Sequence, residues 1–383
     1  MRIAIVLPNF HDEGGVERRT SELVKGLLGE GHDMHVFANR WKDELVRATV
    51  GESRVHHVSM TKAGAAVKQL TFALNARRAT ARGGFDLVHS QARTMGEDVV
   101  TAGGGSHRAW LEVWRRESSS AVERARLRMS AYHRLTLAME RAQYRRCRAL
   151  IANSQFSRDC FIRCNRVPES KLHVVHNGVD CAQFSPANRA KWRDPVRAEL
   201  GLADDEVSVL HMGAGFFRKG LRELIDAVAL ARANGMKHLR LIIVGGGDRT
   251  EYEKHAAFQG LPHSVRFIGA RPNAERYYAA ADIFALLSRF DPFANSTMEA
   301  LASGLPVITT ATNGVSEILE DGVTGFVVPT VRDIKLVADH LCAFVDSELR
   351  ATMGAAGRAL VEARFPWSET TRKTIDVYAK VKS

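Results

Sequence analysis

Two carboxylates, Asp291 and Glu299, are separated by seven residues in the stretch SRFDPFANSTMEALASGLPVITT, residues 288–310. Pro292 disfavours a helical conformation at the residue before it, so we expect Asp291 to be extended in the loop that follows the strand DIFALL. A helix is expected to begin between the two acids. One carboxylate would then precede the helix and the other would lie inside its first turns.

The predicted helix start has the chemistry of an anion site. Ser296 and Glu299 match the S-x-x-E pattern of a capping box, and Asn295 is an alternative N-cap residue. Either cap leaves the backbone amides of residues 296–298 as free donors, whose partial positive charge favours a diphosphate. In the plainer interpretation, Glu299 only closes the capping box and Asp291 is a solvated loop acid.

Two further strand-to-helix turns carry residues of the types that bind phosphate. Arg218 and Lys219 stand next to each other in the loop GAGFFRKG, where Arg offers a planar fork and Lys a point charge. Gly14 and Gly15 form the first such turn, and glycine allows the backbone to approach a ligand closely. The plainer interpretations are a solvated basic loop and a tight turn.

Strands and helices alternate along the chain, which predicts an α/β protein with parallel sheets. The alternation stops at CAQFSPANRAKWRDPVRAELGLADDE, which resembles a linker with a short helix, and restarts at SVLHMG; two helices are expected to end the chain. We therefore expect two Rossmann-like domains, residues 1–180 and 181–367, with a C-terminal helix at 368–383 that packs back on the first. Because ligands sit outside the carboxyl ends of such strands, two facing sheets would enclose a substrate in the cleft between them.

The formal net charge of +11 favours acidic partners, namely phosphates, anionic lipid or nucleic acid. Residues 107–150 contain eleven Arg, no Lys and four Glu, interleaved with aromatic residues. Arg-rich helices with interfacial aromatic residues bind anionic membrane surfaces, whereas the alternative is a solvated helix face or a phosphate-binding rim. The residues expected to contact a membrane are Trp110, Trp114, Arg115, Arg116, Arg124 and Arg126.

The apolar runs and the cysteines of the sequence indicate the compartment of the protein and whether it binds a metal. No apolar run approaches the roughly 18 residues of a membrane span, and MRIAIVLP is too short for the apolar region of a signal peptide. The five cysteines form no CxxC pair, which favours free thiols in a reducing compartment over a zinc site. We expect a cytoplasmic protein without a metal or other cofactor, associated with the inner face of the cytoplasmic membrane.

The order and spacing of these motifs resemble one family throughout, the retaining glycosyltransferases of family four, which have the GT-B fold. The matching segments cover nearly the whole chain: the first GG turn, ANSQFS, VVHNGVD, RKG, VGGG, VRFIG, YAAADIF, DPFANSTMEALASGLPV and NGVSEILEDGVTGFVV. Within the family, FRKG, TAGGGSHRAWLE and DPFAN are most similar to the lipopolysaccharide-core glucosyltransferases.

The resemblance implies roles for single residues. Glu299 would bind the ribose hydroxyls of a donor nucleotide, Asp291 would lie near the donor sugar, and Arg218 with Lys219 would hold the diphosphate. Asp291, Lys219 and Arg218 are the expected catalytic residues. The full expected donor set is Gly14, Gly15, Arg218, Lys219, Gly269, Arg271, Asp291, Asn295, Ser296, Thr297 and Glu299.

The sequence departs from the family pattern at two places. The family commonly has Glu where Asp291 stands, so the contact of this shorter side chain is open. Many relatives have H-x-H at the end of the fourth strand, whereas this chain has His89-Ser90-Gln91, and an amide cannot act as a general base. Gln91 and His107 are candidate acceptor contacts, with an ordinary polar contact as the alternative for His107.

The expected reaction is transfer of a hexose from a UDP-sugar to a lipopolysaccharide-core or similar glycan, including a lipid-linked one. Glucose is the expected hexose and UDP-glucose the expected donor. The cations and helix amides would stabilise the leaving diphosphate in place of a metal. The rivals are a family-four transferase that uses another donor such as GDP-mannose, a sugar-nucleotide 2-epimerase and a basic nucleic-acid binder. Nucleic acid is not an expected partner, because it would not explain the donor-site residues.

Overall fold

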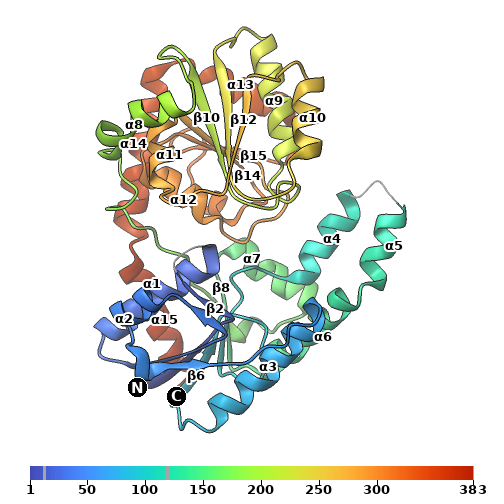
Figure 1. The fold of residues 1–383 in the computed structure, drawn as a ribbon, viewed down its shortest axis with the longest axis vertical. Coiled ribbons are helices and arrows are strands. Elements are labelled where there is room, and N and C mark those ends of the chain that lie inside the picture. The colour runs from blue at the N-terminus through green and yellow to red at the C-terminus, as the bar shows by residue number, and fades with distance from the viewer. Residues whose placement is uncertain (12–13, 118–120, 383) are drawn as a thin grey trace. The chain divides into compact units, whose positions relative to one another are not determined.

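The computed structural model describes residues 1–11, 14–117 and 121–382, with the side chains of residues 123, 124, 126 and 128 also outside the description. The chain forms two compact units (Figure 1), Met1–Asn177 with Trp367–Ser383, and Gly178–Pro366. The first boundary lies three residues before the expected position and the second lies one residue before it.

Unit 1 contains a seven-stranded sheet in the order β5-β3-β1-β6-β7-β8-β9, in which neighbouring strands are parallel. Its strands are β1 (Arg2–Val6), β3 (Asp33–Ala38), β5 (Val55–His57), β6 (Leu87–Ser90), β7 (Val99–Thr101), β8 (Ala149–Ala152) and β9 (Leu172–Val174), and a separate small pair joins β2 (Asn9–Phe10) to β4 (Arg40–Trp41). Its α-helices are α1 (Gly15–Gly29), α2 (Asp43–Ala48), α3 (Ala65–Ala81), α4 (His107–Glu117), α5 (Ala121–Met129), α6 (Ala131–Arg146), α7 (Gln155–Cys160) and α15 (Trp367–Lys382).

Unit 2 contains a six-stranded parallel sheet in the order β12-β11-β10-β13-β14-β15. Its strands are β10 (Val207–Met212), β11 (Leu239–Val244), β12 (Val265–Gly269), β13 (Ile283–Leu286), β14 (Val307–Thr310) and β15 (Phe326–Val328). Its α-helices are α8 (Asn188–Glu199), α9 (Leu221–Ala233), α10 (Thr250–Phe258), α11 (Glu275–Ala280), α12 (Asn295–Ala302), α13 (Ile334–Ala343) and α14 (Ser347–Arg364).

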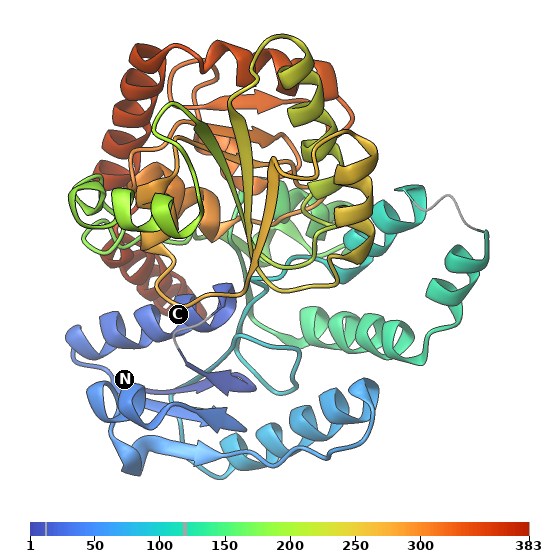
Figure 2. The same ribbon diagram turned by 45° about the horizontal axis from the view of Figure 1, so that its top comes forward.

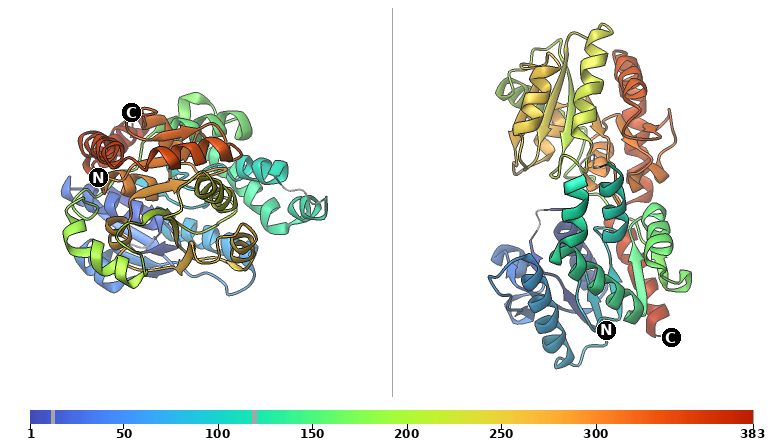
Figure 3. Two further views of the ribbon diagram at one scale, coloured as in Figure 1. Left: turned by 90° about the horizontal axis from the view of Figure 1, so that it is seen from above. Right: turned by 90° about the vertical axis from the view of Figure 1, so that its right-hand side faces the viewer.

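Each sheet is apolar on both faces because alternate residues of a strand point to opposite sides. In β11, Leu241 and Ile243 join the core under α9, α10 and α13, whereas Ile242 and Val244 join the core under α8, α11, α12 and α14. Figures 2 and 3 show helices on both faces of the six-stranded sheet. The expectation of two Rossmann-like α/β units with parallel sheets is confirmed.

The C-terminal helix α15 belongs to unit 1, although the chain reaches it through the whole of unit 2. Its residues Val377, Tyr378 and Val381 are buried in the same core as Leu23 and Leu27 of α1. Gly26 of α1 marks the closest approach, since a Cβ atom there would lie 2.1 Å from Thr371 Oγ1. The expectation that only two helices end the chain is wrong: α13, α14 and α15 follow the last strand.

The Arg-rich segment after Gly105 folds into α4, α5 and α6, and Figure 1 shows α4 and α5 extending away from the seven-stranded sheet of their unit. Among the described residues, no helix is both long and apolar enough to cross a membrane. All five cysteines are free thiols, as expected: Cys147, Cys160, Cys164, Cys181 and Cys342.

Candidate functional site

The loop between β10 and α9 places Arg218 and Lys219 at the carboxyl edge of the sheet in unit 2. Gly220 ends this loop with φ of 65°, and a Cβ atom there would lie 1.9 Å from the carbonyl oxygen of Leu287. At Gly213 a Cβ atom would lie 2.6 Å from Lys219 Cε, so the lysine side chain covers this glycine. Glycine is therefore required at both positions for the loop to close over β10 and β13.

One carboxylate oxygen of Asp291 forms ion pairs with both Arg218 and Lys219. Its Oδ2 atom lies 2.9 Å from Arg218 Nη1 and 3.3 Å from Lys219 Nζ. Asp291 is 6% exposed and Lys219 7% exposed, whereas Arg218 is partly exposed. Burial alone would raise the pKa of Asp291, but Lys219 and Arg218 hold it below its usual range. Burial lowers the pKa of Lys219 more than Asp291 raises it.

The backbone of Asp291 is fixed by the segment that follows β14. Its amide donates to Thr312 O at 3.0 Å, and its carbonyl oxygen accepts from the amide of Gly314 at 2.8 Å. Asp291 thus forms an isolated parallel bridge with Asn313. This extended conformation is the one that Pro292 predicts, and it aims the carboxylate at the cationic loop.

The start of α12 differs from the predicted capping box. The N-cap position is Ala294, no side chain caps the helix, and the Oγ atom of Ser296 has no hydrogen-bond partner in the described structure. Buried Asn313 instead accepts from the amide of Ala294 at 3.2 Å and donates to Thr297 Oγ1 at 3.2 Å. A residue 19 positions later in the chain therefore fixes this helix start, which no local pattern encodes.

Two of the three amides expected to be free are engaged. The amides of Thr297 and Met298 both donate to Ala294 O, at 3.0 and 3.4 Å. Asn295 and Ser296 are half-buried in the first turn. The helix still directs its positive end toward the loop that carries Asp291, but the expectation of three free amides is wrong.

Glu299 is held by Tyr278, a residue that the sequence analysis did not single out. The hydroxyl of Tyr278 lies 2.9 Å from Glu299 Oε2 and 3.1 Å from the carbonyl oxygen of Ser296, and the tyrosine is fully buried. The hydroxyl thus links the carboxylate to the first turn of α12. A tyrosine at an amphipathic position of YYAAADIF is ordinarily a core residue, which is why the sequence offered no signal for this contact.

Arg289 joins the cationic loop to the loop of Asp291 and was also missed. Its amide donates to Arg218 O at 2.8 Å, its Nη1 donates to Phe217 O at 2.6 Å, and its Nη2 pairs with Glu223 of α9. Its guanidinium also lies over the Phe217 ring, 4.4 Å from the centroid. These contacts set the position of Arg218 and Lys219 relative to Asp291.

Gly269 and Arg271 lie at the carboxyl end of β12, two strands away from β10 in the same sheet. Gly269 has φ of 79°, and its carbonyl oxygen accepts from the amide of Gly245 at 3.0 Å. Arg271 is exposed. The predicted donor residues of unit 2 thus follow β10, β12 and β13, and the structure brings Arg218, Lys219 and Asp291 into direct contact.

In unit 1, Gly14 and Gly15 are exposed at the start of α1, where Gly14 has φ of 90°.

Gln91 follows β6, and both the oxygen and the nitrogen of its side-chain amide are hydrogen-bonded. Its Oε1 accepts from Arg19 Nη1 at 3.0 Å, and its Nε2 lies 3.1 Å from His89 Nε2. Gln91 therefore belongs to a buried polar cluster that includes Arg19, which the sequence analysis did not identify.

His107 begins α4, and its ring contacts α6. His107 Nε2 lies 3.0 Å from His133 Nδ1, and the His107 amide donates to Glu140 Oε1 at 3.2 Å. The same buried carboxylate pairs with Arg93 at 2.9 Å. Burial, Arg93 and His133 together lower the pKa of His107 to about 4. His107 is therefore neutral near pH 7 and has a hydrogen-bond partner within its own unit.

The residues expected at a membrane are distributed over α4 and α5. The rings of Trp110 and Trp114 lie 5.6 Å apart and are half-buried, and Arg115 and Arg116 are exposed. The side chains of Arg124 and Arg126 lie outside the described residues. Val122 and Met129 of α5 are also exposed.

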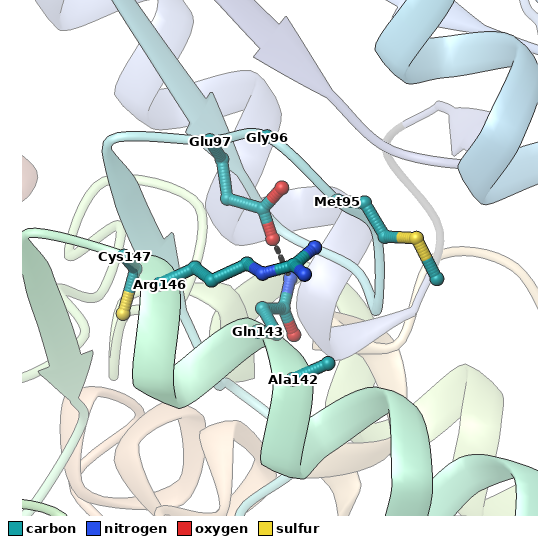
Figure 4. A pocket seen from close by; sticks show the side chains of 7 residues that line it. All are labelled: Met95, Gly96, Glu97, Ala142, Gln143, Arg146 and Cys147. Carbon is teal, nitrogen blue, oxygen red and sulfur yellow. Dashed lines mark hydrogen bonds between the residues drawn. The ribbon is translucent and has the colours of Figure 1, made fainter.

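A small cavity in unit 1 lies between Glu97 and α6 (Figure 4). Its volume of about 10 Å³ matches a single water molecule, and Gln143 donates to Glu97 within it. It contains none of the predicted site residues, and it is too small for a substrate. Among the described residues, no group of three or more His, Cys, Asp or Glu is arranged to hold a metal ion.

Two family models match the chain, one in each unit. Residues 13–183 match the model Glycosyltransferase Family 4, and residues 193–360 match the model Glycosyl transferases group 1. Each covers somewhat less than half of the chain, and together they cover most of it. The boundary between the units, after Asn177, lies six residues before the end of the first match.

Two relatives named as glycosyltransferases share limited identity with the chain. A D-inositol 3-phosphate glycosyltransferase of Nocardioides sp. is 27% identical over 98% of this chain and 87% of its own length. The uncharacterized glycosyltransferase MJ1607 of Methanocaldococcus jannaschii is 29% identical, but the match spans 55% of this chain and only 54% of that relative.

Solved structures agree with the fold over its full length. WaaG, a glycosyltransferase involved in lipopolysaccharide biosynthesis, gives a TM-score of 0.82 at 19% identity, covering 98% of this chain and 99% of WaaG. Anabaena HepE, crystallised in complex with UDP-glucose, gives a TM-score of 0.73 at 21% identity, covering 99% of this chain and all of HepE. At these identities the likeness establishes the fold alone.

Proposed function

The chain belongs to the family 4 glycosyltransferases with the GT-B fold, and on this premise we propose that it transfers glucose from UDP-glucose to a lipopolysaccharide-core or similar glycan, with retention of configuration. The observation that carries the proposal is the convergence of Arg218 and Lys219 on Asp291 at the carboxyl edge of the sheet in unit 2. Paired cations are suited to binding a diphosphate. Ligands of open α/β sheets bind at this carboxyl edge, where the two cations lie.

The cations act on the leaving group. Transfer breaks the bond between the sugar C1 atom and the diphosphate oxygen, and it forms a bond from C1 to the acceptor oxygen. Negative charge develops on the diphosphate, and Arg218 and Lys219 stabilise it electrostatically without a metal. Their contact with Asp291 fixes their position. A bound diphosphate would share the cations with Asp291.

Retention of configuration follows from attack on the same face from which the diphosphate leaves. Asp291 is engaged by two cations, so it is a poor nucleophile for a covalent intermediate. Gln91 cannot accept the acceptor proton, and neutral His107 already contacts His133. We assign the proton of the acceptor hydroxyl to the departing diphosphate oxygen, which gains basicity as the C1–O bond breaks.

Glu299 supports the assignment of a nucleoside donor. Its carboxylate is oriented by Tyr278 beside the first turn of α12, in the same unit as the cations. A carboxylate accepts two hydroxyl donors at once, as the ribose 2′- and 3′-hydroxyls provide. The relative HepE, which was crystallised with UDP-glucose, favours uridine as the base. GDP-mannose is the rival donor.

The acceptor has two candidate classes. The structural likeness to WaaG, which acts in lipopolysaccharide biosynthesis, favours a lipopolysaccharide-core glycan. The relative from Nocardioides sp., aligned over nearly the whole chain, is named for D-inositol 3-phosphate and favours a small phosphorylated acceptor. A lipid-linked acceptor would require the enzyme to work at a membrane surface.

We assign the protein to the cytoplasmic face of the membrane as a peripheral protein. Trp110, Trp114, Arg115 and Arg116 place aromatic rings and guanidinium groups on one helix of the α4–α5 extension. Such a helix binds anionic headgroups, and salt weakens the attraction. Vesicles with anionic lipid should bind the protein at low salt, and charge reversal at Arg115 and Arg116 should abolish binding. Unchanged binding would exclude this surface.

A panel of sugar nucleotides tests the main proposal. The enzyme is incubated with UDP-glucose, UDP-galactose, UDP-N-acetylglucosamine and GDP-mannose, without acceptor, and slow release of the nucleotide is measured. UDP-glucose should be hydrolysed fastest, and EDTA should leave the rate unchanged. A crystal soaked with UDP should place the diphosphate at Arg218 and Lys219; a nucleotide bound elsewhere would refute the proposal.

A further inference from the structure

Arg19 is a fully buried cation whose charge has no acidic partner among the described residues. The side chain is 1% exposed, and burial lowers its pKa to about 10, so it is charged at neutral pH. Its Nη1 atom donates to Gln91 Oε1 at 3.0 Å. Its Nε and Nη2 atoms have no hydrogen-bond partner within the described structure.

The two unused atoms form one edge of the guanidinium. Nε–H and one Nη2–H point in the same direction, at the spacing that matches two oxygens of a carboxylate or phosphate. Nη1, which lies on the other side, is the atom that Gln91 occupies. The bidentate edge of Arg19 is therefore buried and has no hydrogen-bond partner among the described residues.

Among the described residues, the polar cluster around Arg19 supplies no negative charge. Gln91 Nε2 lies 3.1 Å from His89 Nε2, and His89 also contacts Thr101 Oγ1 at 2.8 Å and the hydroxyl of Tyr378 at 2.7 Å. All these side chains are uncharged, since burial lowers the pKa of His89 to about 3. An uncompensated buried cation is strongly unfavourable, and such features are retained where a ligand needs them.

The cluster lies at the ligand-binding edge of its sheet. Gln91 directly follows β6, Thr101 ends β7, and Arg19 is in the second turn of α1, just after the exposed glycines Gly14 and Gly15. Gln91 remains 6% exposed, so the cluster reaches the surface at this side chain. In open α/β sheets, ligands bind outside the carboxyl ends of the strands, where these residues are.

We propose that the Nε–Nη2 edge of Arg19 is a subsite for an oxyanion, a carboxylate or a phosphate carried by the acceptor. The position of Gln91 fixes the guanidinium, and the oxyanion completes its hydrogen bonds and neutralises its charge. The subsite selects acceptors with an acidic group over neutral ones. Naming the acceptor as the carrier rests on the proposed transferase function, whereas anion binding itself does not.

Anion binding is tested on the full-length protein with saturating UDP, so that the cations of unit 2 are occupied. Inorganic phosphate and, separately, malonate are titrated while the melting temperature and the heat of binding are recorded. The unsubstituted protein should be stabilised, Arg19→Met should bind at least 10-fold more weakly, and Arg19→Lys should be intermediate because it lacks the fork. Without anion, Arg19→Met should melt at a higher temperature than the unsubstituted protein.

Lys25→Met removes a partly exposed cation from the same helix and should leave the response to phosphate unchanged. Asp12→Asn/Glu13→Gln removes the two acids before α1 that lie outside the described residues, and should also leave it unchanged. Equal phosphate binding by Arg19→Met would overturn the proposal. So would a response that appears only in Asp12→Asn/Glu13→Gln, because the chain's own acids would then fill the edge.

The second part of the experiment measures transfer to acidic and to neutral acceptors of the same size. Arg19→Met should lower kcat/KM at least 10-fold for the acidic acceptor only, and hydrolysis of UDP-glucose without acceptor should be retained. Equal losses for both acceptors would overturn the selectivity. If the unsubstituted protein hydrolyses no sugar nucleotide, the proposed function fails, while the phosphate titration still decides whether Arg19 binds an oxyanion.

Discussion

The ammonium group of Lys219 lies 3.3 Å from Asp291 Oδ2, and both side chains are almost completely buried. Neither charge would be stable there alone, because a buried ion that loses its partner is strongly destabilising. Each charge therefore stabilises the other, at the place where the proposed diphosphate would bind. Stability and activity should respond differently when the two residues are changed.

Lys219→Met should lower activity by about 10²–10³-fold, the usual loss when a group that stabilises transition-state charge is removed. It should also lower the free energy of unfolding by about 3–5 kcal/mol, because Asp291 keeps only the partly exposed Arg218. Lys219→Met/Asp291→Asn should recover most of the stability and none of the activity. Recovery of turnover in the double variant would show that Lys219 has only a structural role.

Tyr278→Phe should raise the KM for the donor by about 3–10-fold with a smaller change in kcat. The lost hydrogen bond to a carboxylate is worth about 1.5–3 kcal/mol at most, and only part of it orients Glu299 for the ribose. Steady-state kinetics with varied UDP-sugar provides the measurement. Tyr277→Phe removes a hydroxyl from the adjacent buried tyrosine of the same helix and serves as the control. An equal effect of both substitutions would argue against a specific role for Tyr278.

Arg289→Lys should reduce kcat/KM for the donor by about 10-fold, although the charge is kept. A lysine cannot donate simultaneously to Phe217 O and to Glu223, so the loop that carries Arg218 and Lys219 loses its fixed position. Arg249→Lys, at an exposed ion pair in the same unit, is the matched control. If Arg289→Lys is as active as that control, the loop is positioned by its backbone alone.

The sequence was sufficient for the parts of the site that depend on local pattern. The alternation of strands with helices predicted the two parallel sheets, and Pro292 predicted the extended backbone of Asp291. The sequence was insufficient where a site residue is held by a hydrogen-bond partner that is distant in the chain. The side chain of Asn313, rather than a capping box, fixes the start of α12. Its amide nitrogen is held by Thr309 of β14, and its oxygen accepts from the amide of Ala294 at the helix start, where Ser296 was expected to act.

The polar cluster of unit 1 illustrates the same limit. The motif His89-Ser90-Gln91 was interpreted as the loss of a catalytic histidine, which is correct chemistry for Gln91. The sequence did not reveal that Gln91 would hold Arg19, or that Tyr378 would reach His89 from a helix 289 residues away. The contact between Tyr378 and His89 depends on the return of α15 to unit 1, which packing decides and no local spacing encodes.

The burial of His89 makes the stability of unit 1 depend on pH. Burial lowers the pKa of His89 to about 3, whereas the unfolded chain has the ordinary value of 6.5. Between these values the unfolded state binds a proton that the folded state excludes, so stability falls as the pH drops below about 6.5. At pH 5 this single group costs about 2 kcal/mol of unfolding free energy relative to pH 7.

His89→Asn should remove that part of the pH dependence, since asparagine does not titrate. Denaturant unfolding at pH 7 and pH 5 gives the measurement: the loss of unfolding free energy on acidification should be about 2 kcal/mol smaller in the variant. His211, whose pKa burial also lowers to about 3, contributes equally to both proteins and cancels in the comparison. His263→Asn, at an exposed histidine, should behave like the unsubstituted protein. An equal loss in His89→Asn and the unsubstituted protein would mean that His89 is protonated in the folded state as readily as in the unfolded chain.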